Sequence, residues 1–365
     1  MTVPRFVSRL LPAIGLIAVF ALADMGGAFA RTVAEIANLT GPDRQKILEE
    51  GAKKEGALLW IGGLNQKRAR RPILKAFMKK YPYIEAKGIR TGSRKALQRV
   101  LAEHRAKTPR VDVINANVVI DLKNAGLVQA FRSPALAAYP EKEKDPNRIW
   151  ATMRYSYHGV AAYNTDMVSA AEAPKTFEDL LDPKWKGKMV WGENAETGAR
   201  FLITYLRKTW GEAKTLDFLK KLSKQKVVTR TSSIRNILDL VVAGEHHIMI
   251  SPALHHVGGA RKKGAPIQAS MVNPVLARNG YFMLMKTAPN PYAAMLLIDF
   301  ILGEEAQKIL KKARYFPAHP KVSPAKQMRP YQPSLKGLEQ FTVNAEMMHA
   351  EAKKSDELYR KYFFK

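Results

Sequence analysis

Hydrophobic positions in the first third of the chain repeat with two periods that alternate. Short apolar runs such as ALLWIGG at residues 57–63 predict buried strands, whereas ARRPILKAFMKKYP at residues 69–82 places Ile73, Leu74 and Phe77 on one side of a helix. The same alternation predicts a helix at residues 41–56 that ends at Gly56, a strand at 83–90, a helix at 92–106, and a strand and a helix within 110–127. Strands that alternate with helices indicate an α/β fold with a mostly parallel sheet and helices on both faces.

The pattern changes after Trp150. Residues 151–166 (ATMRYSYHGVAAYNTD) combine aromatic and small side chains with a period of two and predict one long strand. Residues 291–313 keep helical spacing throughout and predict one long helix. Further helices are expected at residues 197–211, 213–225, 234–245 and 344–363, and further strands within 226–233, 246–251 and 280–289.

One segment near the midpoint, APKTFEDLLDPKWKGKMVWG at residues 173–192, specifies several elements in a short length. Thr176 can cap a short helix, and Phe177 and Trp185 can cover a sheet. Gly187 allows the turn that leads into a short buried strand. The segment therefore predicts scaffold, and the candidate ligand loop follows it.

The first thirty residues have the features of an export signal. Arg5 and Arg9 make the start positive, and the apolar run at residues 10–23 is short for a membrane span. Ala28-Phe29-Ala30 matches a cleavage site. We expect a signal peptide of residues 1–30, cleaved after Ala30, and a mature protein in the periplasm; a single membrane anchor is the alternative.

Composition narrows the classes of protein that remain. The 365 residues contain no cysteine and 46% apolar residues, so stability must come from ordinary hydrophobic cores, and the length suits two domains. Sixty basic and 32 acidic residues give a net charge of +28. In an exported protein this charge does not indicate nucleic acid. It fits an anionic envelope surface, an anionic ligand, or the basic character that many exported bacterial proteins share.

The usual catalytic motifs are missing. The chain has no G-x-S-x-G, no H-E-x-x-H and no G-x-x-x-x-G-K-[ST]. The histidine pairs at residues 246–247 and 255–256 have weak metal spacing, because adjacent residues of a strand point to opposite faces. We expect no enzyme, no cofactor and no metal site; an exported hydrolase remains an alternative.

Small polar residues follow the expected strands. In open α/β sheets, ligands lie at the carboxyl ends of the strands, where helix starts offer free backbone N–H groups. The alternative is that these residues only cap helices. The loops are residues 62–65, 91–93, 115–117, 193–198 and 231–233, and Ser251. A basic cluster near the first long helix fits either a nearby anion or a solvated face: Lys67, Arg68, Arg70 and Arg71.

Five segments stand in a characteristic order: AKKEGALLWIGG at 52–63, NTDMVSAAEAPKTFEDLLDPKWKGKMVWG at 164–192, VVAGEHHIMIS at 241–251, NPYAAMLLIDFILGEEAQKIL at 290–310 and RYFPAHP at 314–320. Together they resemble the landmarks of bacterial extracellular solute-binding proteins, in the branch that contains the periplasmic ferric-iron-binding proteins. The resemblance covers residues 45–319. It implies a monomeric receptor that passes a small solute to the inner-membrane permease of an ABC importer; a sensory role is an alternative.

The resemblance also implies an architecture. We expect the type II periplasmic binding protein fold, in which two α/β lobes joined by crossing strands close on the solute. Lobe 1 is expected to hold residues 31–156 and 277–325, and lobe 2 to hold residues 157–276. Residues 326–365 form a tail and a helix that packs on lobe 2.

Iron-binding members of that branch use a histidine, a glutamate, two consecutive tyrosines and a bound anion. The histidine position falls near Leu64 and the glutamate position on Asn117. The tyrosine pair falls on Ala253-Leu254 or Leu254-His255. Leu and Asn do not supply the anionic oxygens that ferric iron prefers. We therefore predict that ferric iron is not bound through protein ligands alone.

The predicted ligand is a small organic or phosphorus-containing anion, for example a phosphonate, sugar phosphate, sulfonate or carboxylate. Arg94 is ranked first as its charge partner, because Arg154 should face away from Tyr155 and Tyr157 on one strand. These tyrosines could line the ligand or replace the missing iron ligands, so ferric iron or an iron chelate stays open. Thr197-Gly198-Ala199 resembles the anion loop of the branch. The full candidate set is Asn65, Thr91, Ser93, Arg94, Asn117, Arg154, Tyr155, Tyr157, Thr197, Gly198, Ala199, Ser233 and His255.

Overall fold

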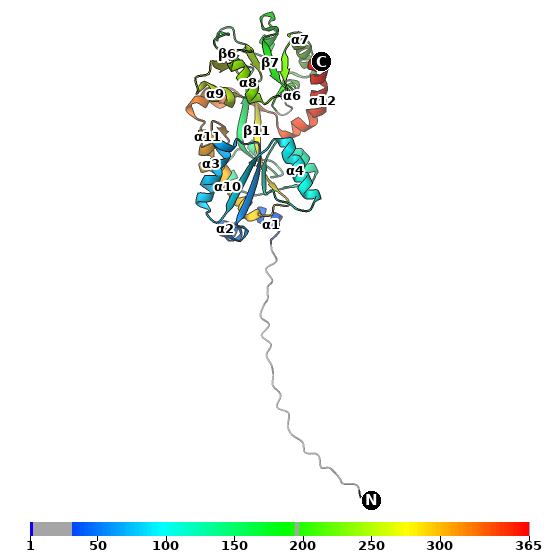
Figure 1. Ribbon diagram of the computed structural model, residues 1–365, viewed down its shortest axis with the longest axis vertical. Helices are drawn as coiled ribbons and strands as arrows, with labels where there is room; N and C mark the ends of the chain where they lie inside the picture. Colours follow the sequence, from blue (N-terminus) through cyan, green and yellow to red (C-terminus); the bar gives the residue numbers. More distant parts are fainter. Residues whose placement is uncertain (3–30, 194–196, 365) are drawn as a thin grey trace. The chain divides into compact units, whose positions relative to one another are not determined.

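Two mixed β-sheets, each packed against helices, make up the chain from Thr32 onward (Figure 1). The computed structural model describes residues 1–2, 31–193 and 197–364 of the chain. Residues 3–30 of the expected signal peptide, with its cleavage site, lie outside the described residues. Within the described part, none of the helices combines the length and the apolar character that crossing a lipid bilayer requires.

The first sheet has the strand order β12-β5-β11-β3-β1-β2, with β4 and β13 also paired to β11. Strand β1 pairs in parallel with β2 and β3, as the alternation of strands and helices predicts. The pairs that β5 makes with β11 and β12 are antiparallel. Its strands are β1 (Ala57–Gly62), β2 (Glu85–Arg90), β3 (Val113–Asn115), β4 (Val128–Gln129), β5 (Ala151–His158), β11 (Val275–Met285), β12 (Phe316–Pro317) and β13 (Gln340–Thr342).

The second sheet has the order β10-β6-β9-β7-β8. Strand β7 pairs in parallel with β8 and β9, and β6 pairs antiparallel with β9 and β10. Alternate residues of β7 enter different hydrophobic cores, because Val190 packs on one face and Trp191 on the other. Its strands are β6 (Ala161–Asn164), β7 (Met189–Gly192), β8 (Val228–Arg230), β9 (Ile248–Ile250) and β10 (Ile267–Ala269).

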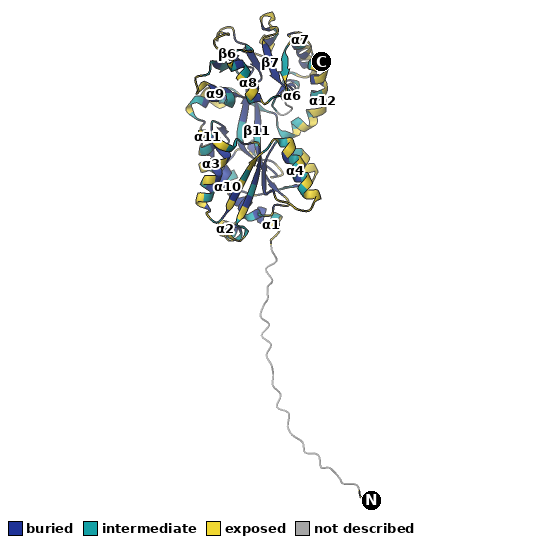
Figure 2. Cartoon of the chain, viewed as in Figure 1, coloured by how far each residue is buried: buried dark blue, intermediate teal, exposed yellow. Residues whose placement is uncertain are grey.

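The helices complete two lobes, which we define by these sheets. Lobe 1 contains α1 (Val33–Ala37), α2 (Arg44–Glu55), α3 (Arg71–Lys80), α4 (Ser93–Arg105), α5 (Val119–Asn124), α10 (Pro291–Leu302) and α11 (Glu304–Lys312). Lobe 2 contains α6 (Ala199–Trp210), α7 (Glu212–Ser223), α8 (Ile234–Val242) and α9 (Leu254–Arg261). The last helix, α12 (Ala345–Phe363), packs on α6 and α7. Figure 2 shows buried strands inside each lobe and exposed outer helix faces.

Strands β5 and β11 connect the two sheets. They pair antiparallel over most of their length, and each is followed or preceded by a strand of lobe 2. Strand β5 leads directly into β6, and β10 leads into β11. One face of this ribbon lies next to the carboxyl ends of the parallel strands of both sheets.

The midpoint segment forms the scaffold that its sequence predicts. The Thr176 hydroxyl accepts a hydrogen bond from the Asp179 backbone N–H, which opens the short 3-10 helix Glu178–Leu181. Phe177 and Trp185 are both buried in the core of lobe 2. Gly187 adopts a left-handed φ of 75°, where a side chain would be strained.

Two long elements of the sequence prediction are wrong, because each is divided at a glycine. Residues 151–166 form β5 and β6 in different sheets, and a side chain at Gly159 would meet the Ser270 carbonyl oxygen at 2.4 Å. Residues 291–313 form α10 and α11, separated at Gly303, which is extended (φ −77°, ψ 161°). Strand β11 also begins before the predicted residues, and α9 was not predicted.

Candidate functional site

A cavity of about 520 Å³ lies at the strand ends of both lobes and against the β5–β11 ribbon. The ends of β1, β2 and β3 line it from lobe 1, and the residues after β8 and β9 line it from lobe 2. These are the positions at which ligands bind in open α/β sheets. Seven of the sequence-predicted residues line this cavity: Asn65, Ser93, Asn117, Arg154, Thr197, Ser233 and His255.

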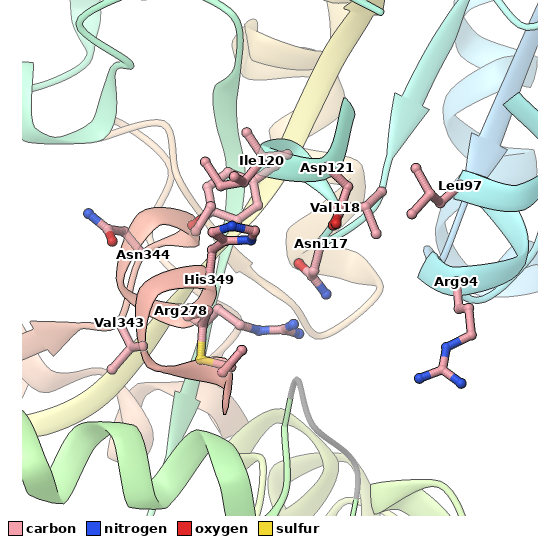
Figure 3. Close-up of a pocket in the computed structure, with 15 residues that line it drawn as sticks. Arg94, Leu97, Asn117, Val118, Ile120, Asp121, Arg278, Val343, Asn344 and His349 are labelled. Atoms are coloured by element: carbon pink, nitrogen blue, oxygen red, sulfur yellow. The ribbon is translucent and has the colours of Figure 1, made fainter. Parts of the chain in front are cut away.

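Other predicted residues lie elsewhere. Arg94 lines a neighbouring cavity rather than this one (Figure 3). Tyr155 and Tyr157 stack on each other at 5.6 Å and line a third cavity, on the opposite face of β5. Thr91, Gly198 and Ala199 adjoin lining residues without lining the cavity themselves: Gly92 and Ser93 follow Thr91, and Thr197 precedes the other two.

The register of the ribbon places two arginines on the cavity side. Arg154 lies opposite Gly280, and Ser156 lies opposite Arg278, so all four share one face. Gly280 leaves room for the Arg154 side chain, because a Cβ there would come within 2.8 Å of the Arg154 Cγ. The alternation that turns Tyr155 away from the cavity therefore turns Arg154 into it.

Arg154 forms no ion pair with a carboxylate of the described residues. Its guanidinium lies 4.8 Å from the centre of the Tyr315 ring. Its Nε and Nη1 atoms are shielded from solvent and have no hydrogen-bond partner among the described residues. Burial lowers the pKa of Arg154 from its usual range, which means that the site disfavours its charge until an anion is supplied.

The rest of the lining is also basic. Arg68, Arg90, Arg235 and Arg278 contribute to the cavity wall, and no Asp or Glu is among the described residues that line it. Arg235 is paired with Asp239 at 2.7 Å. Low-dielectric walls that carry one sign of charge concentrate the potential, so the cavity should attract anions.

Two arginines of the basic cluster near the first long helix, Arg68 and Arg70, have different environments. Arg68 lines the cavity, whereas Arg70 is fully buried beneath it. The Arg70 Nη2 donates to the Gly62 carbonyl oxygen at 2.7 Å and to the Asn115 Oδ1 at 3.0 Å. Burial, with a smaller effect from Arg90, lowers the pKa of Arg70 to about 10. Arg70 therefore supports the end of β1 from behind.

Several predicted polar residues also have structural partners. The Ser233 hydroxyl caps α8 by accepting from the Asn236 N–H at 3.2 Å, and the Asn65 Oδ1 accepts from the Arg68 N–H at 2.9 Å. The Ser93 hydroxyl accepts from the Asn117 N–H at 3.2 Å. Capping and ligand binding are compatible, because a hydroxyl that accepts one bond can still donate another.

Three helix starts border the cavity without a side-chain cap. The residues before α4, α6 and α9 are Gly92, Gly198 and Ala253, and none makes a capping side-chain bond. Their first backbone N–H groups lack helical partners and carry partial positive charge. These dipoles add to the arginine charge at the same cavity.

A serine and a histidine on β5 resemble part of a hydrolase site. The His158 Nδ1 lies 3.2 Å from the Ser251 carbonyl oxygen and must donate to it, so its Nε2 accepts from the Ser156 hydroxyl at 3.3 Å. Burial, then Arg278, lowers the pKa of His158 to about 3, against the smaller effect of the Ser251 carbonyl. A base with this pKa removes a serine proton poorly at neutral pH. The hydrogen bond between Ser156 and His158 therefore has a structural role in strand β5.

The positions of the iron ligands hold apolar or amide groups. Leu64 and Leu254 are fully buried, and Asn117 lines the cavity. In the described part of the chain, no three His, Cys, Asp or Glu residues are grouped as a metal site would need. His255 and His256 line the cavity, and burial lowers the pKa of both, that of His256 to about 3.

Arg278 and Tyr315 also line the cavity, although sequence reasoning did not select them. Both belong to the part of the chain that returns to lobe 1 after the residues of lobe 2. Their place depends on strand pairings that a single sequence does not reveal. Ser156 could have been found, because it lies two residues from Arg154 on the same strand.

Comparisons with known proteins identify the family of the chain. The family described as bacterial extracellular solute-binding protein matches residues 109–335, more than half of the chain. An uncharacterized protein of Haemophilus influenzae is 27% identical over 259 residues, 65% of this chain and 70% of its own. The iron uptake protein A1 of Synechocystis is 25% identical over 211 residues, 52% of this chain and only 56% of its own length.

Solved structures share the fold. The Trichodesmium protein IdiA (FutA), in complex with iron and citrate, superposes with a TM-score of 0.71 at 19% identity, covering 85% of this chain and all of that one. The periplasmic binding protein AfuA of Actinobacillus pleuropneumoniae, with fructose-6-phosphate bound, superposes with a TM-score of 0.70 at 22% identity, covering 84% and 98%. The fold is the two-lobed type of periplasmic binding proteins.

Proposed function

The chain belongs to the bacterial extracellular solute-binding protein family, and from this premise we propose that it is the periplasmic receptor of an ABC importer and captures a small organic anion in the 520 Å³ cavity. The observation that carries the proposal is Arg154, whose shielded Nε and Nη1 lack a partner among the described residues. A bound anion would supply the missing negative charge and acceptors.

The cavity chemistry supports a phosphoryl or carboxylate group as the head of this anion. Guanidinium groups bind both groups through paired N–H bonds. Arg154 and Arg278 stand on the ribbon, and Ser93, Thr197 and the helix starts surround them. An oxyanion with several acceptor oxygens could accept hydrogen bonds from the arginines of the ribbon and from the hydroxyl and backbone N–H groups around them.

Iron enters this proposal only as a chelate. Some relatives are named as iron uptake proteins, and one neighbouring structure holds iron with citrate. The basic lining described above would repel a bare ferric ion, whereas the carboxylates of a ferric citrate complex could contact it. A tyrosinate charge-transfer band that appears in the visible on adding ferric citrate would instead indicate direct iron ligation.

The remaining parts of the proposal follow from the family and the sequence. Residues 31–156 and 277–325 would move as lobe 1 against residues 157–276, with residues 326–365 attached to lobe 2. The mature receptor would begin after Ala30, act as a monomer, and dock on an inner-membrane permease. Neither nucleic acid nor catalysis has a role in it.

A thermal-shift screen of the mature protein tests the proposal. The library contains inorganic phosphate, phosphonates, sugar phosphates, sulfonates, citrate and ferric citrate, with amines, neutral sugars and metal salts as counter-classes. A ligand at 100 times its Kd should stabilise the fold by about 2.7 kcal/mol. Stabilisation by cations or amines alone, or turnover of a bound ligand, would show that the proposal is wrong.

A further inference from the structure

A second cavity, of about 390 Å³, lies beside the anion cavity, between α4, α5 and the start of α12 (Figure 3). We call it the annex. Its walls are mainly apolar and come from α4, α5, β11 and α12, with the residues just before α5 and α12. The larger aliphatic side chains are Leu97, Val118, Val119, Ile120, Val343 and Met348.

The annex adjoins the anion cavity. Asn117, Arg278 and Tyr281 line both. Figure 3 shows the Asn117 and Arg278 side chains projecting into the space between α12 and α4. A molecule whose charged group reaches Arg278 in the anion cavity therefore lies within reach of the annex.

The charges of the two cavities differ. The anion cavity carries several arginines and no acidic residue among its described lining, whereas the annex adds only Arg94 and Asp121 to the Arg278 that both cavities share. The charges of Arg94 and Asp121 are opposite, so beyond Arg278 the annex adds no net charge that would bind a second ionic group. Its apolar walls favour the burial of hydrocarbon.

We propose that the annex binds the neutral, apolar part of the ligand whose anionic head occupies the cavity at Arg154. This inference rests on the proposed function and narrows it. The ligand is an organic anion with an alkyl or aryl body, and a bare inorganic oxyanion would leave the annex empty. Each buried methylene should lower Kd about four-fold, or about 0.8 kcal/mol.

Two head-matched series measure this effect by calorimetry. Methyl-, propyl- and pentylphosphonate share one head group, and acetate, butyrate and hexanoate share another. Within the series that binds, we expect Kd to fall about four-fold for each added methylene until the annex is filled. An Arg154→Met variant should weaken every member, because the head group is common to all.

A matched pair of tryptophan variants localises the effect. Ala352 lines the annex from an exposed position of α12, and Ala350 is exposed on the same helix without lining it. Ala352→Trp should remove the gain from chain length while leaving the methyl or acetate member unchanged. Ala350→Trp should leave both unchanged.

The outcomes separate the inference from the proposed function. If short and long members bind equally through Arg154, the annex inference is wrong and the anion receptor stands. If Ala352→Trp weakens short and long members alike, the annex affects lobe closure rather than the ligand body, and the inference is also wrong. If no anion of any size binds, the proposed function fails and the inference fails with it.

Discussion

Replacement of Arg154 by methionine should change ligand-free stability and ligand binding in opposite directions. Methionine keeps the length of the stem over Gly280 but removes the guanidinium. Without ligand, the change removes a charge that burial disfavours, as the lowered pKa of Arg154 indicates. The ligand-free variant should therefore be at least as stable as the wild type.

The loss of binding can be estimated. Hydrogen bonds to a charged group contribute about 1.5–3 kcal/mol, which corresponds to an increase in Kd of about 10- to 150-fold. A ligand at 100 times the wild-type Kd stabilises the wild type by about 2.7 kcal/mol. At that concentration, a variant with a 100-fold weaker Kd would gain only about 0.4 kcal/mol.

Chemical unfolding with and without the anion found by the screen measures both quantities. Arg105→Met, at an exposed position of α4, is the control and should change neither. Arg154→Lys keeps the positive charge but loses the paired N–H donors of the guanidinium. Its Kd for the anion should therefore lie between those of the wild type and Arg154→Met. If Arg154→Met binds the anion as the wild type does, or if its ligand-free form is clearly less stable, Arg154 is a structural residue and the reasoning is refuted.

Three further changes follow from the site. His158 has a pKa of about 3 in the folded protein, below its value of about 6.5 in the unfolded chain. Between these two values the unfolded chain binds one more proton, so the free energy of unfolding should fall as the pH drops, by about 1.4 kcal/mol per pH unit. The variant His158→Gln should reduce this pH dependence, as measured by denaturant unfolding at several pH values. Gly280→Ala should cost about 1–3 kcal/mol of stability and weaken anion binding, since its Cβ would crowd the Arg154 stem, whereas Gly92→Ala, with no atom within 4 Å, should be tolerated in the same denaturation assay. Thr197→Ala should raise the anion Kd about five-fold by calorimetry and leave the ligand-free midpoint nearly unchanged.

Local signals in the sequence predicted most elements of lobe 1. Gly56 ends α2 in the left-handed conformation, and Ile73, Leu74 and Phe77 form the buried side of α3. These features depend on residues within a few positions of one another, so a single sequence contains them. The mixed pairing of the first sheet was not predicted, because β5 and β11 meet across more than a hundred residues of intervening chain.

The two divided elements show where periodicity loses information. The period-two pattern continues through Gly159 without a break, yet the strand on each side of it joins a different sheet. Periodicity reports which side of a segment is buried but not what covers it. At Gly303, the apolar positions of α10 and α11 fall close to one helical register, so only the glycine itself signalled the division.

The sequence analysis predicted the lobe 1 loops that line the candidate site, but it predicted the β5–β11 ribbon beneath the site only in part. The strand-end rule selected Asn65, Ser93 and Asn117, and all three line the cavity. Alternation separated Arg154 from Tyr155, but the sequence analysis placed the tyrosines at the ligand and ranked Arg94 above Arg154, whereas the structure places Arg154 in the cavity and the tyrosines on the other face. That placement depends on Gly280 of the partner strand, which leaves space for the arginine on one face only.

If the lobes close on the ligand, as the proposed function requires, the distribution of charge gives a reason for binding and closure to be coupled. Arg90 approaches the cavity from lobe 1 and Arg154 from the ribbon, while Arg235 of lobe 2 is paired with Asp239. An anion in the cavity would attract these arginines toward itself, so under the proposed function its charge would favour closure of the lobes. The ligand thus needs no contact that favours the closed state other than its own charge. An uncharged analogue of the same shape should bind weakly and leave the lobes apart, even if its apolar body fits the annex.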